Sequence, residues 1–295
     1  MSRILVVGGT GLVGAALVRA WSARGDETVS AARRPGGPGR TLRLDLTDAA
    51  AVRKAVADLR PAIVAVPAAN PHVDYCQAHP EETRAVNVAG PLNAARAARA
   101  AGARTVFFSS DYVFDGVRGA YTEEDAPNPL NEYGRQKAEA EAGVLAADPR
   151  ALVIRTSGVY GWQEEPKNFV LQVRVRLAAG ETLRVASDLL YNPTWAENLA
   201  EVVVALAAAG SAGIFHVAGP ETLARSEFAV RIARAFGLDP ALLEAVPAAA
   251  FGSATPRPKE SGLRTDKVRA AVAVPLIGVD EGLRRMRALE SEPRI

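Results

Sequence analysis

Short apolar runs alternate with longer amphipathic segments through the first half of the chain, and this alternation constrains the fold more than any other feature. We expect strands at 4–7, 28–31, 42–44, 62–66, 105–108 and 152–154. Helices are expected between them, at 12–24, 48–59, 81–101 and 131–147. Strands and helices that alternate at this spacing predict βαβ units. Most runs are apolar on both faces, as in strands covered by helices on each side. The sequence therefore predicts an α/β fold with a doubly wound parallel sheet.

The second half of the chain departs from this regular alternation. Further helices are expected at 167–179, 195–208 and 225–236, while residues 183–185, 195–208 and 214–217 resemble a return to the main sheet. We expect a cofactor-binding domain of residues 1–160 plus about 186–218. Residues of about 161–185 plus 219–295 should form a smaller C-terminal substrate-binding lobe over the carboxyl edge of the sheet.

The composition excludes several classes of protein. The 35 basic and 33 acidic residues leave a net charge of +2, and no block of like charge suits a nucleic-acid backbone. The single cysteine cannot form an internal disulfide, and three scattered histidines do not predict a metal site. No apolar run approaches the roughly 20 residues of a membrane span, and no signal peptide is recognisable. We expect a soluble, cytoplasmic monomer or homodimer that binds no metal, nucleic acid or membrane.

A glycine-rich segment directly follows the first expected strand and begins the first helix. Its glycines have the spacing GxxGxxG. Backbone without Cβ atoms can approach a pyrophosphate, and the N-terminus of a helix offers free N–H groups. A tight strand-to-helix turn would have the same sequence, but the placement favours a dinucleotide site in a Rossmann-type domain. The residues expected to contact the dinucleotide are Gly8, Thr10, Gly11, Leu12, Val13 and Gly14.

The end of the second expected strand indicates which dinucleotide binds. An NAD site commonly has an acidic residue there, whereas this strand runs into Arg33 and Arg34. Two guanidinium groups suit a 2′-phosphate, so we expect NADP (NADPH), with NAD still possible. A solvated turn is the alternative. Asp45 and Leu46 end the third strand and are expected at the adenine edge, although a helix cap would have the same sequence.

Tyr133 and Lys137 are four residues apart at the start of an expected helix and therefore share one face. A nearby cation favours the phenolate, so Lys137 should lower the pKa of Tyr133 and make it a usable general acid. Ser109 and Ser110 follow the expected strand at 105–108 and should lie on the carboxyl edge of the sheet, where α/β proteins bind ligands. An exposed helix face and an ordinary turn are the alternatives for these two motifs.

Together these motifs resemble the dTDP-4-dehydrorhamnose reductase group of the extended short-chain dehydrogenases/reductases, over nearly the whole chain. The resemblance rests on segments 8–14, 73–74, 79–81, 87–88, 109–116, 129–134, 155–157, 193–194 and 257–258. It implies a catalytic triad of Ser110, Tyr133 and Lys137, with Lys137 also holding the nicotinamide ribose. It further implies cofactor contacts from Val66, Pro67, Ala68 and Asn87, and substrate contacts from Ser109, Asp111, Asn168, Phe169 and Arg257.

The sequence departs from that group around the expected sugar pocket. Gly158 stands where the reductases usually have a Trp that is expected to line this pocket. Leu189 and Tyr191 replace a Gln and a Gly, and residues 66–69 read Val-Pro-Ala-Ala in place of Asn-Ala-Ala-Ala. These differences concern the substrate rather than the hydride chemistry.

The resemblance and the triad predict an NADPH-dependent reductase that acts on the ketone of a nucleotide-linked 4-keto-deoxysugar. Two other functions are compatible with the same fold. One is a nucleotide-sugar epimerase or dehydratase that keeps its NAD bound through the cycle. The other is a non-catalytic NADP-binding subunit of the kind that regulates methionine adenosyltransferase.

Overall fold

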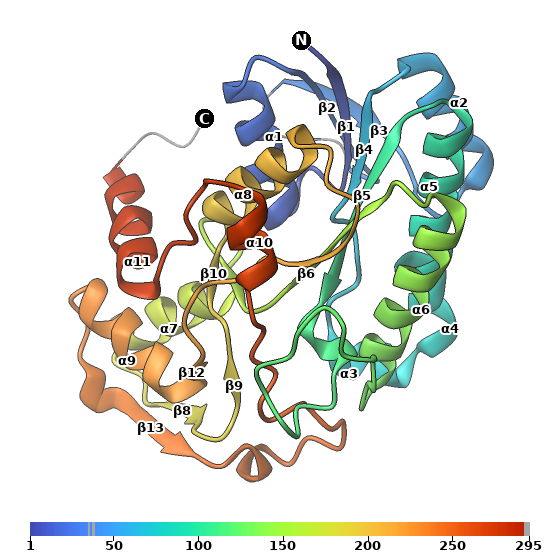
Figure 1. Cartoon of the computed structure of the whole chain (residues 1–295). Coiled ribbons are helices and arrows are strands. Elements are labelled where there is room, and N and C mark those ends of the chain that lie inside the picture. The colour runs from blue at the N-terminus through green and yellow to red at the C-terminus, as the bar shows by residue number, and fades with distance from the viewer. Residues whose placement is uncertain (35, 37–38, 292–295) are drawn as a thin grey trace.

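The computed structural model describes residues 1–34, 36 and 39–291. The strands of its main sheet are β1 (Arg3–Val7), β2 (Glu27–Ala32), β3 (Arg40–Arg43), β4 (Ile63–Val66), β5 (Arg104–Ser110), β6 (Leu152–Thr156) and β11 (Gly213–His216). All seven are parallel, in the order β11-β6-β5-β4-β1-β2-β3 (Figure 1). The α/β fold with a Rossmann-type doubly wound sheet is thereby confirmed.

Helices cover both faces of this sheet. The helices on one face are α1 (Leu12–Ala23) and α8 (Ala196–Ala208), and those on the other are α2 (Ala49–Leu59), α5 (Gly90–Ala100) and α6 (Glu132–Ala147) (Figure 1). Alternate residues of β1 enter the two resulting cores. Ile4 and Val6 pack with the α1/α8 layer, whereas Leu5 and Val7 pack with the α2/α5 layer. This two-sided burial explains why the strands are apolar at successive positions.

The helix expected at 81–101 is present without a gap, as α4 (Pro80–Arg84), a π-helical turn (Ala85–Ala89) and α5. A short helix, α3 (Val73–Ala78), precedes it. Asn87 lies within the π-helical turn and is completely buried. Such turns occur inside α-helices, frequently at functional sites, and Asn87 in this one is bonded to Asn70 in the loop that follows β4.

A smaller lobe lies beside the carboxyl edge of the sheet and has its own core. Its helices are α7 (Phe169–Ala178), α9 (Arg225–Ala235) and α11 (Val279–Ala288), and Phe228 of α9 is fully buried in their shared core. Three two-stranded pairs contribute to this core: β7 (Val159–Tyr160) with β10 (Thr194–Trp195), β8 (Leu183–Ala186) with β13 (Leu243–Val246), and β9 (Leu190–Tyr191) with β12 (Leu223–Ala224). The core therefore takes in β7, β9 and β10, which lie outside the segments expected for the lobe. The remaining elements are α10 (Asp266–Ala271) and 3₁₀ turns at Asp111–Val113, Pro240–Leu242, Ala248–Phe251 and Leu289–Ser291.

The expected return to the main sheet is correct for one strand and wrong for another. The segment predicted at 214–217 forms β11, which pairs with β6 at the edge of the sheet. The segment predicted at 183–185 forms β8, which pairs with β13 in the lobe. Val185 packs into the lobe core with Phe228, so burial of its side chain holds this strand away from the sheet.

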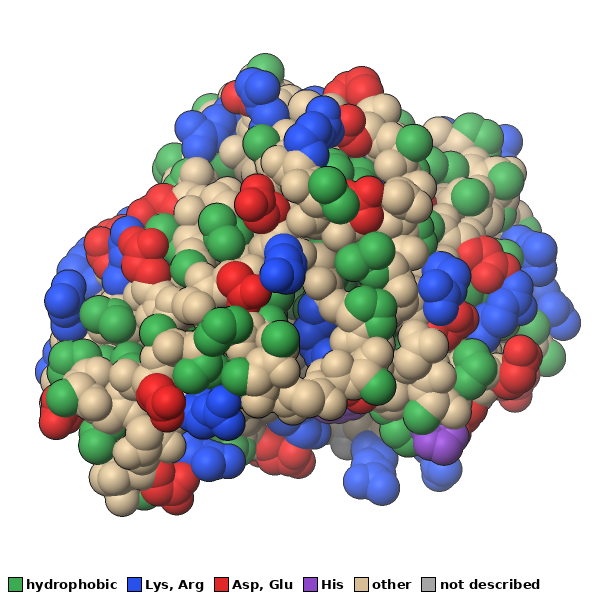
Figure 2. All heavy atoms as spheres, turned by 90° about the horizontal axis from the view of Figure 1, so that it is seen from below, with side chains coloured by type: hydrophobic (Ala, Val, Ile, Leu, Met, Phe, Trp, Pro, Cys, Tyr) green, Lys and Arg blue, Asp and Glu red, His purple; other side chains and the backbone are tan. Residues whose placement is uncertain are grey.

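Acidic and basic side chains are interspersed over the face seen in Figure 2, which views the protein from below Figure 1. This mixed pattern differs from the single-sign stripe of a nucleic-acid-binding surface. In the described part of the chain, no helix combines the length and the apolar character needed to cross a bilayer. The same residues contain no group of three or more His, Cys, Asp or Glu side chains arranged to hold a metal ion.

Candidate functional site

The candidate catalytic side chains meet where the carboxyl end of β5 faces the first two turns of α6. Ser110 is the last residue of β5, and Tyr133 and Lys137 project from one face of α6. Their exposed fractions are 7%, 8% and 2%, so all three are withdrawn from bulk water. The structure therefore brings together the Ser, Tyr and Lys that the sequence predicted as a triad.

The ammonium of Lys137 is held by the sheet. Its Nζ donates a hydrogen bond of 2.8 Å to the carbonyl oxygen of Phe108 in β5. The same atom lies 4.9 Å from the ring centroid of Phe107 and 5.9 Å from that of Tyr133. This places the cation beside the phenol ring and fixes the orientation of the lysine.

The expected lowering of the Tyr133 pKa is wrong for this structure. Burial raises the pKa of the Tyr133 phenol, and interaction with the Ser110 hydroxyl opposes this rise without overcoming it. Burial also lowers the pKa of Lys137 to about 8, with the negative charge of Glu141 opposing it. Sequence spacing shows that two groups can be neighbours, but it does not reveal how completely the surrounding residues remove water from them.

The lowered pKa of Lys137 leads to a prediction about how kcat/KM depends on pH. If the charged lysine is needed, kcat/KM should fall as the pH rises through about 8, because Lys137 then loses its proton. The pKa of Lys137 in the folded protein lies below the ordinary lysine value of 10.5. Between these two pH values the unfolded chain binds more protons than the folded one, so the free energy of unfolding rises with pH. Activity should therefore decline without unfolding. Measurements of kcat/KM and circular dichroism from acid to alkaline pH test this, and a rate that stays constant well beyond pH 8 would contradict it.

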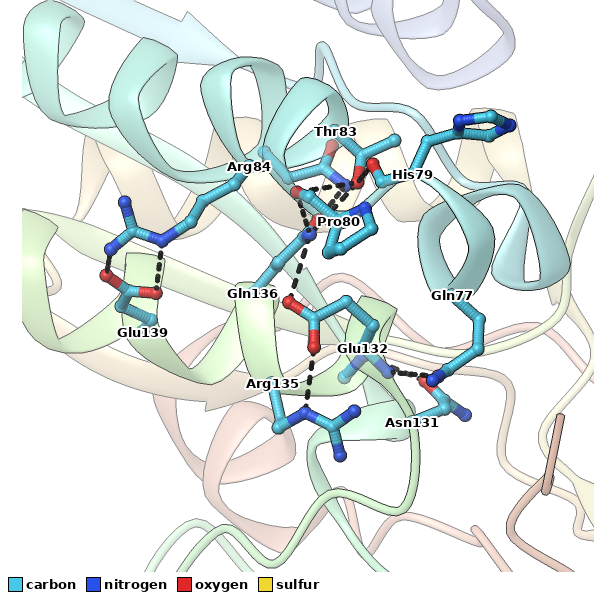
Figure 3. Close-up of polar contacts among 12 residues, drawn as sticks. Gln77, His79, Pro80, Thr83, Arg84, Asn131, Glu132, Arg135, Gln136 and Glu139 are labelled. Atoms are coloured by element: carbon cyan, nitrogen blue, oxygen red, sulfur yellow. Dashed lines mark hydrogen bonds and ion pairs between the residues drawn. The ribbon is translucent and has the colours of Figure 1, made fainter.

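The first turn of α6 is anchored by polar side chains at its N-terminus. Asn131 caps the helix through a 2.9 Å bond from the Gly134 N–H, and its amide donates to the carbonyl oxygen of Pro256. Gln136 reaches α4, where it donates to the Thr83 hydroxyl at 2.9 Å (Figure 3). These contacts hold the helix that carries Tyr133 and Lys137 against both neighbouring segments.

Asp111 lies next to Ser110 and accepts hydrogen bonds from three serine hydroxyls. Ser110 donates to Oδ1 at 2.9 Å, while Ser157 and Ser261 donate to Oδ2 at 2.8 and 2.6 Å. Burial raises the pKa of this carboxyl, and the three hydroxyl contacts oppose the rise. Asp111 was predicted as a substrate contact, but its partners were not. Ser157 belongs to the motif at 155–157, whereas no local pattern marks Ser261 at a separation of 150 residues.

The glycine-rich loop has the backbone geometry of a phosphate-binding turn. Gly8 has a φ of +97°, and the Gly11 N–H donates to the Gly8 carbonyl oxygen at 3.0 Å. A Cβ on Gly14 would collide with that same carbonyl, so only glycine permits this close crossing. No side chain caps the N-terminus of α1, which leaves its first N–H groups available for an anionic group. Thr10 lies on this turn, and Leu12 and Val13 begin α1 directly after it, so the predicted loop residues are together and fit a dinucleotide pyrophosphate.

The other predicted cofactor residues lie around this loop. Arg33 and Arg34 are exposed directly after β2, and Arg33 is close enough to Asp45 to help lower its pKa, although contacts from Thr47 lower it more. Leu46 is buried against Gly90. Val66 ends β4, and Pro67 and Ala68 follow it along the same edge. Ala68 donates its N–H to the Val7 carbonyl and closely approaches Gly8.

The side-chain amide of Asn87 forms hydrogen bonds within the protein through both its oxygen and its nitrogen. Its Oδ1 accepts from the Asn70 N–H at 2.7 Å, and its Nδ2 donates to the Asn70 carbonyl and the Gln136 Oε1. Through these bonds Asn87 holds the loop after β4 against α6.

The predicted substrate residues lie in two parts of the molecule, beside the triad and in the lobe. Ser109 lies beside the triad with a buried hydroxyl that has no hydrogen-bond partner in the described structure. Asn168 caps α7, and Phe169 lies under the Arg225 guanidinium, 4.0 Å from its ring centroid. Arg257 pairs with Asp74 of α3 at 2.7 Å and so links the lobe to the main domain.

The fold and the clustered Ser, Tyr and Lys define an NAD(P)-dependent oxidoreductase of the Rossmann class. Residues 1–290 match the RmlD substrate binding domain family. The chain belongs to this family of dTDP-4-dehydrorhamnose reductase-like proteins, which confirms the resemblance seen in its motifs.

Comparisons with individual proteins find both reductases and a methionine adenosyltransferase subunit. The dTDP-4-dehydrorhamnose reductase of Streptomyces griseus is 36% identical over 93% of this chain and 89% of its own length. The mouse methionine adenosyltransferase 2 subunit beta is 32% identical over 80% of this chain and 72% of its own. A crystal structure of dTDP-4-dehydrorhamnose reductase from Bacillus anthracis in complex with NADP has a TM-score of 0.90 and 27% identity, covering 97% of this chain and 99% of that one.

Proposed function

We propose that this protein is an NADPH-dependent reductase of the ketone in a nucleotide-linked 4-keto-deoxysugar. The observation that carries the proposal is the burial of Ser110, Tyr133 and Lys137 together at the carboxyl edge of the sheet. This edge also carries the uncapped N-terminus of α1, which fits the pyrophosphate of a dinucleotide.

A bound NADPH would supply the hydride for this reduction, while residues of this chain act on the carbonyl oxygen. Tyr133 donates its phenolic proton to the carbonyl oxygen, so that the ketone becomes an alcohol. Ser110 holds the same oxygen, for which its hydroxyl must turn away from Asp111. Lys137 holds the nicotinamide ribose and offsets negative charge that develops on the phenol. The high pKa set by burial keeps Tyr133 protonated until the substrate oxygen becomes basic.

The lobe formed by residues of about 161–185 and 219–295 would bind the nucleotide sugar. Phe169 and Arg225 stack on one another in this lobe, and Arg257 ties it to α3. A guanidinium over an aromatic ring offers both a surface for a base and a charge for a diphosphate. We therefore place the nucleotide between the lobe and the main domain.

Removing both arginines after β2 should reveal which dinucleotide the protein prefers. Each guanidinium can form charge-assisted hydrogen bonds to a 2′-phosphate, so Arg33→Ala with Arg34→Ala should raise the KM for NADPH about tenfold or more. The KM for NADH should change little. Arg53→Ala, which alters an exposed arginine on α2, is the matched control. Equal KM values for NADPH in wild type and double variant would rule out this assignment.

Two other functions of related proteins give different results in one assay. The protein is mixed with NADPH and dTDP-4-dehydrorhamnose, and the loss of NADPH absorbance is followed. A reductase consumes one NADPH for each product molecule, whereas an epimerase or dehydratase regenerates its dinucleotide. A regulatory subunit of the methionine adenosyltransferase type would bind NADPH without consuming it. Absence of NADPH consumption across a set of nucleotide-linked keto-sugars would reject the proposed function.

A further inference from the structure

The Tyr191 ring lies directly against Gly158 at the junction of the sheet and the lobe. Gly158 lies between β6 and β7 with a φ of +52°, in the left-handed region that favours glycine. A Cβ built on Gly158 would collide with Cδ2 and Cε2 of the Tyr191 ring. The tyrosine ring therefore occupies the space directly above the glycine, and a side chain at 158 would displace it.

The residue that precedes each partner in this contact connects it to the Asp111 carboxylate. Ser157, which precedes Gly158, donates to Asp111 Oδ2 at 2.8 Å. Ser261 donates to the same oxygen at 2.6 Å, and its N–H donates to the carbonyl oxygen of Leu190, which precedes Tyr191. Because Asp111 directly follows Ser110, the Tyr191 ring lies beside the candidate catalytic cluster.

The ring is held in place and keeps part of its surface accessible. Phe228 contacts it in an edge-on geometry, with the ring centroids 6.3 Å apart, and β9 pairs with β12. Tyr191 is only partly buried. Arg225 begins α9 beside this strand pair, where its backbone N–H donates to the carbonyl oxygen of Leu189 at 2.9 Å. A fixed aromatic ring that is partly accessible and lies beside the Asp111 cluster is suited to contact a ligand bound there.

We propose that Tyr191 forms the aromatic wall of the sugar-binding pocket, with Gly158 providing the clearance for its ring. The inference rests on the proposed function and extends it. The ring presents an apolar surface, so it packs against C–H groups of the sugar. The ring, rather than the phenolic hydroxyl, supplies this contact.

Binding and turnover of matched ligands test the proposal. Tyr191→Ala should raise the KM for dTDP-4-dehydrorhamnose about tenfold and weaken dTDP-glucose binding by a similar factor, while dTDP binding stays within twofold. Tyr191→Phe should resemble wild type in all three measurements. Phe236→Ala removes another partly buried aromatic ring of the lobe core, so it should lower the melting temperature without changing the KM. Titration calorimetry with NADP present measures the two affinities.

The outcomes separate this inference from the proposed function. If the wild-type protein binds dTDP-glucose but consumes no NADPH with any keto-sugar, the proposed function fails. The effect of Tyr191→Ala on dTDP-glucose affinity, relative to its effect on dTDP affinity, still decides whether Tyr191 forms the wall. If Tyr191→Ala leaves both the KM and the dTDP-glucose affinity within twofold, the wall is overturned. Equal weakening of dTDP and dTDP-glucose would also overturn it, as would a wild-type protein that binds neither ligand.

Discussion

Tyr133→Phe should lower the rate of keto-sugar reduction by about 10²–10⁴-fold while the protein remains folded and still binds NADPH. The substitution removes one hydroxyl and keeps the ring that lies in the edge-on contact with Tyr112. Without that hydroxyl no positioned acid protonates the carbonyl oxygen, and general acid catalysis is worth about this factor. Single-turnover absorbance of NADPH measures the loss.

The matched control for this variant is Tyr75→Phe. Tyr75 is an exposed residue of α3 whose hydroxyl donates to Glu82 at 2.8 Å, outside the candidate site. It should leave the rate within twofold. A Tyr133→Phe protein with a wild-type rate would show that another group supplies the proton.

The second large effect concerns stability. Arg155 on β6 and Glu141 on α6 form a two-pronged ion pair with distances of 2.9 and 2.7 Å, and their side chains are only 2% and 4% exposed. Glu141→Ala leaves the guanidinium buried without its carboxylate, which should cost about 3–5 kcal/mol in the free energy of unfolding. The pair also joins α6 to the sheet one turn after Lys137, so its loss should loosen the triad.

Urea unfolding of Glu141→Ala measures this cost. Glu139→Ala is the control, because Glu139 pairs with Arg84 on the surface, where each side chain is close to half exposed. Surface ion pairs contribute about 0–1 kcal/mol. Equal effects of the two substitutions would contradict the importance of the buried pair.

The framework of the fold could be predicted because its pattern is local. Strands such as β1 and β6 are apolar on both faces, and helices α1 and α6 begin after a glycine loop and after Asn131, both readable signals. β8 was placed in the wrong sheet because its partner β13 is about 60 residues away. A strand of four residues does not specify which of several edges it joins.

The candidate site could be predicted where its residues follow sequence-ordered elements. Ser110, Tyr133 and Lys137 are marked by the end of a strand and by spacing on a helix. The Ser261 contact with Asp111 and the contact of Tyr191 with Gly158 depend on how the lobe meets the sheet, which no local pattern records. The raised pKa of Tyr133 likewise depends on burial by many residues at once.

The central claim is a net transfer of hydride to a sugar ketone, and an isotope measurement tests it most directly. The wild-type protein is supplied with dTDP-4-dehydrorhamnose and NADPH deuterated at the transferable position of the nicotinamide. The product, analysed by mass spectrometry and NMR, should contain one carbon-bound deuterium at the former carbonyl carbon for each NADPH consumed. A product that forms without deuterium, or without consumption of NADPH, would contradict the assignment as a reductase.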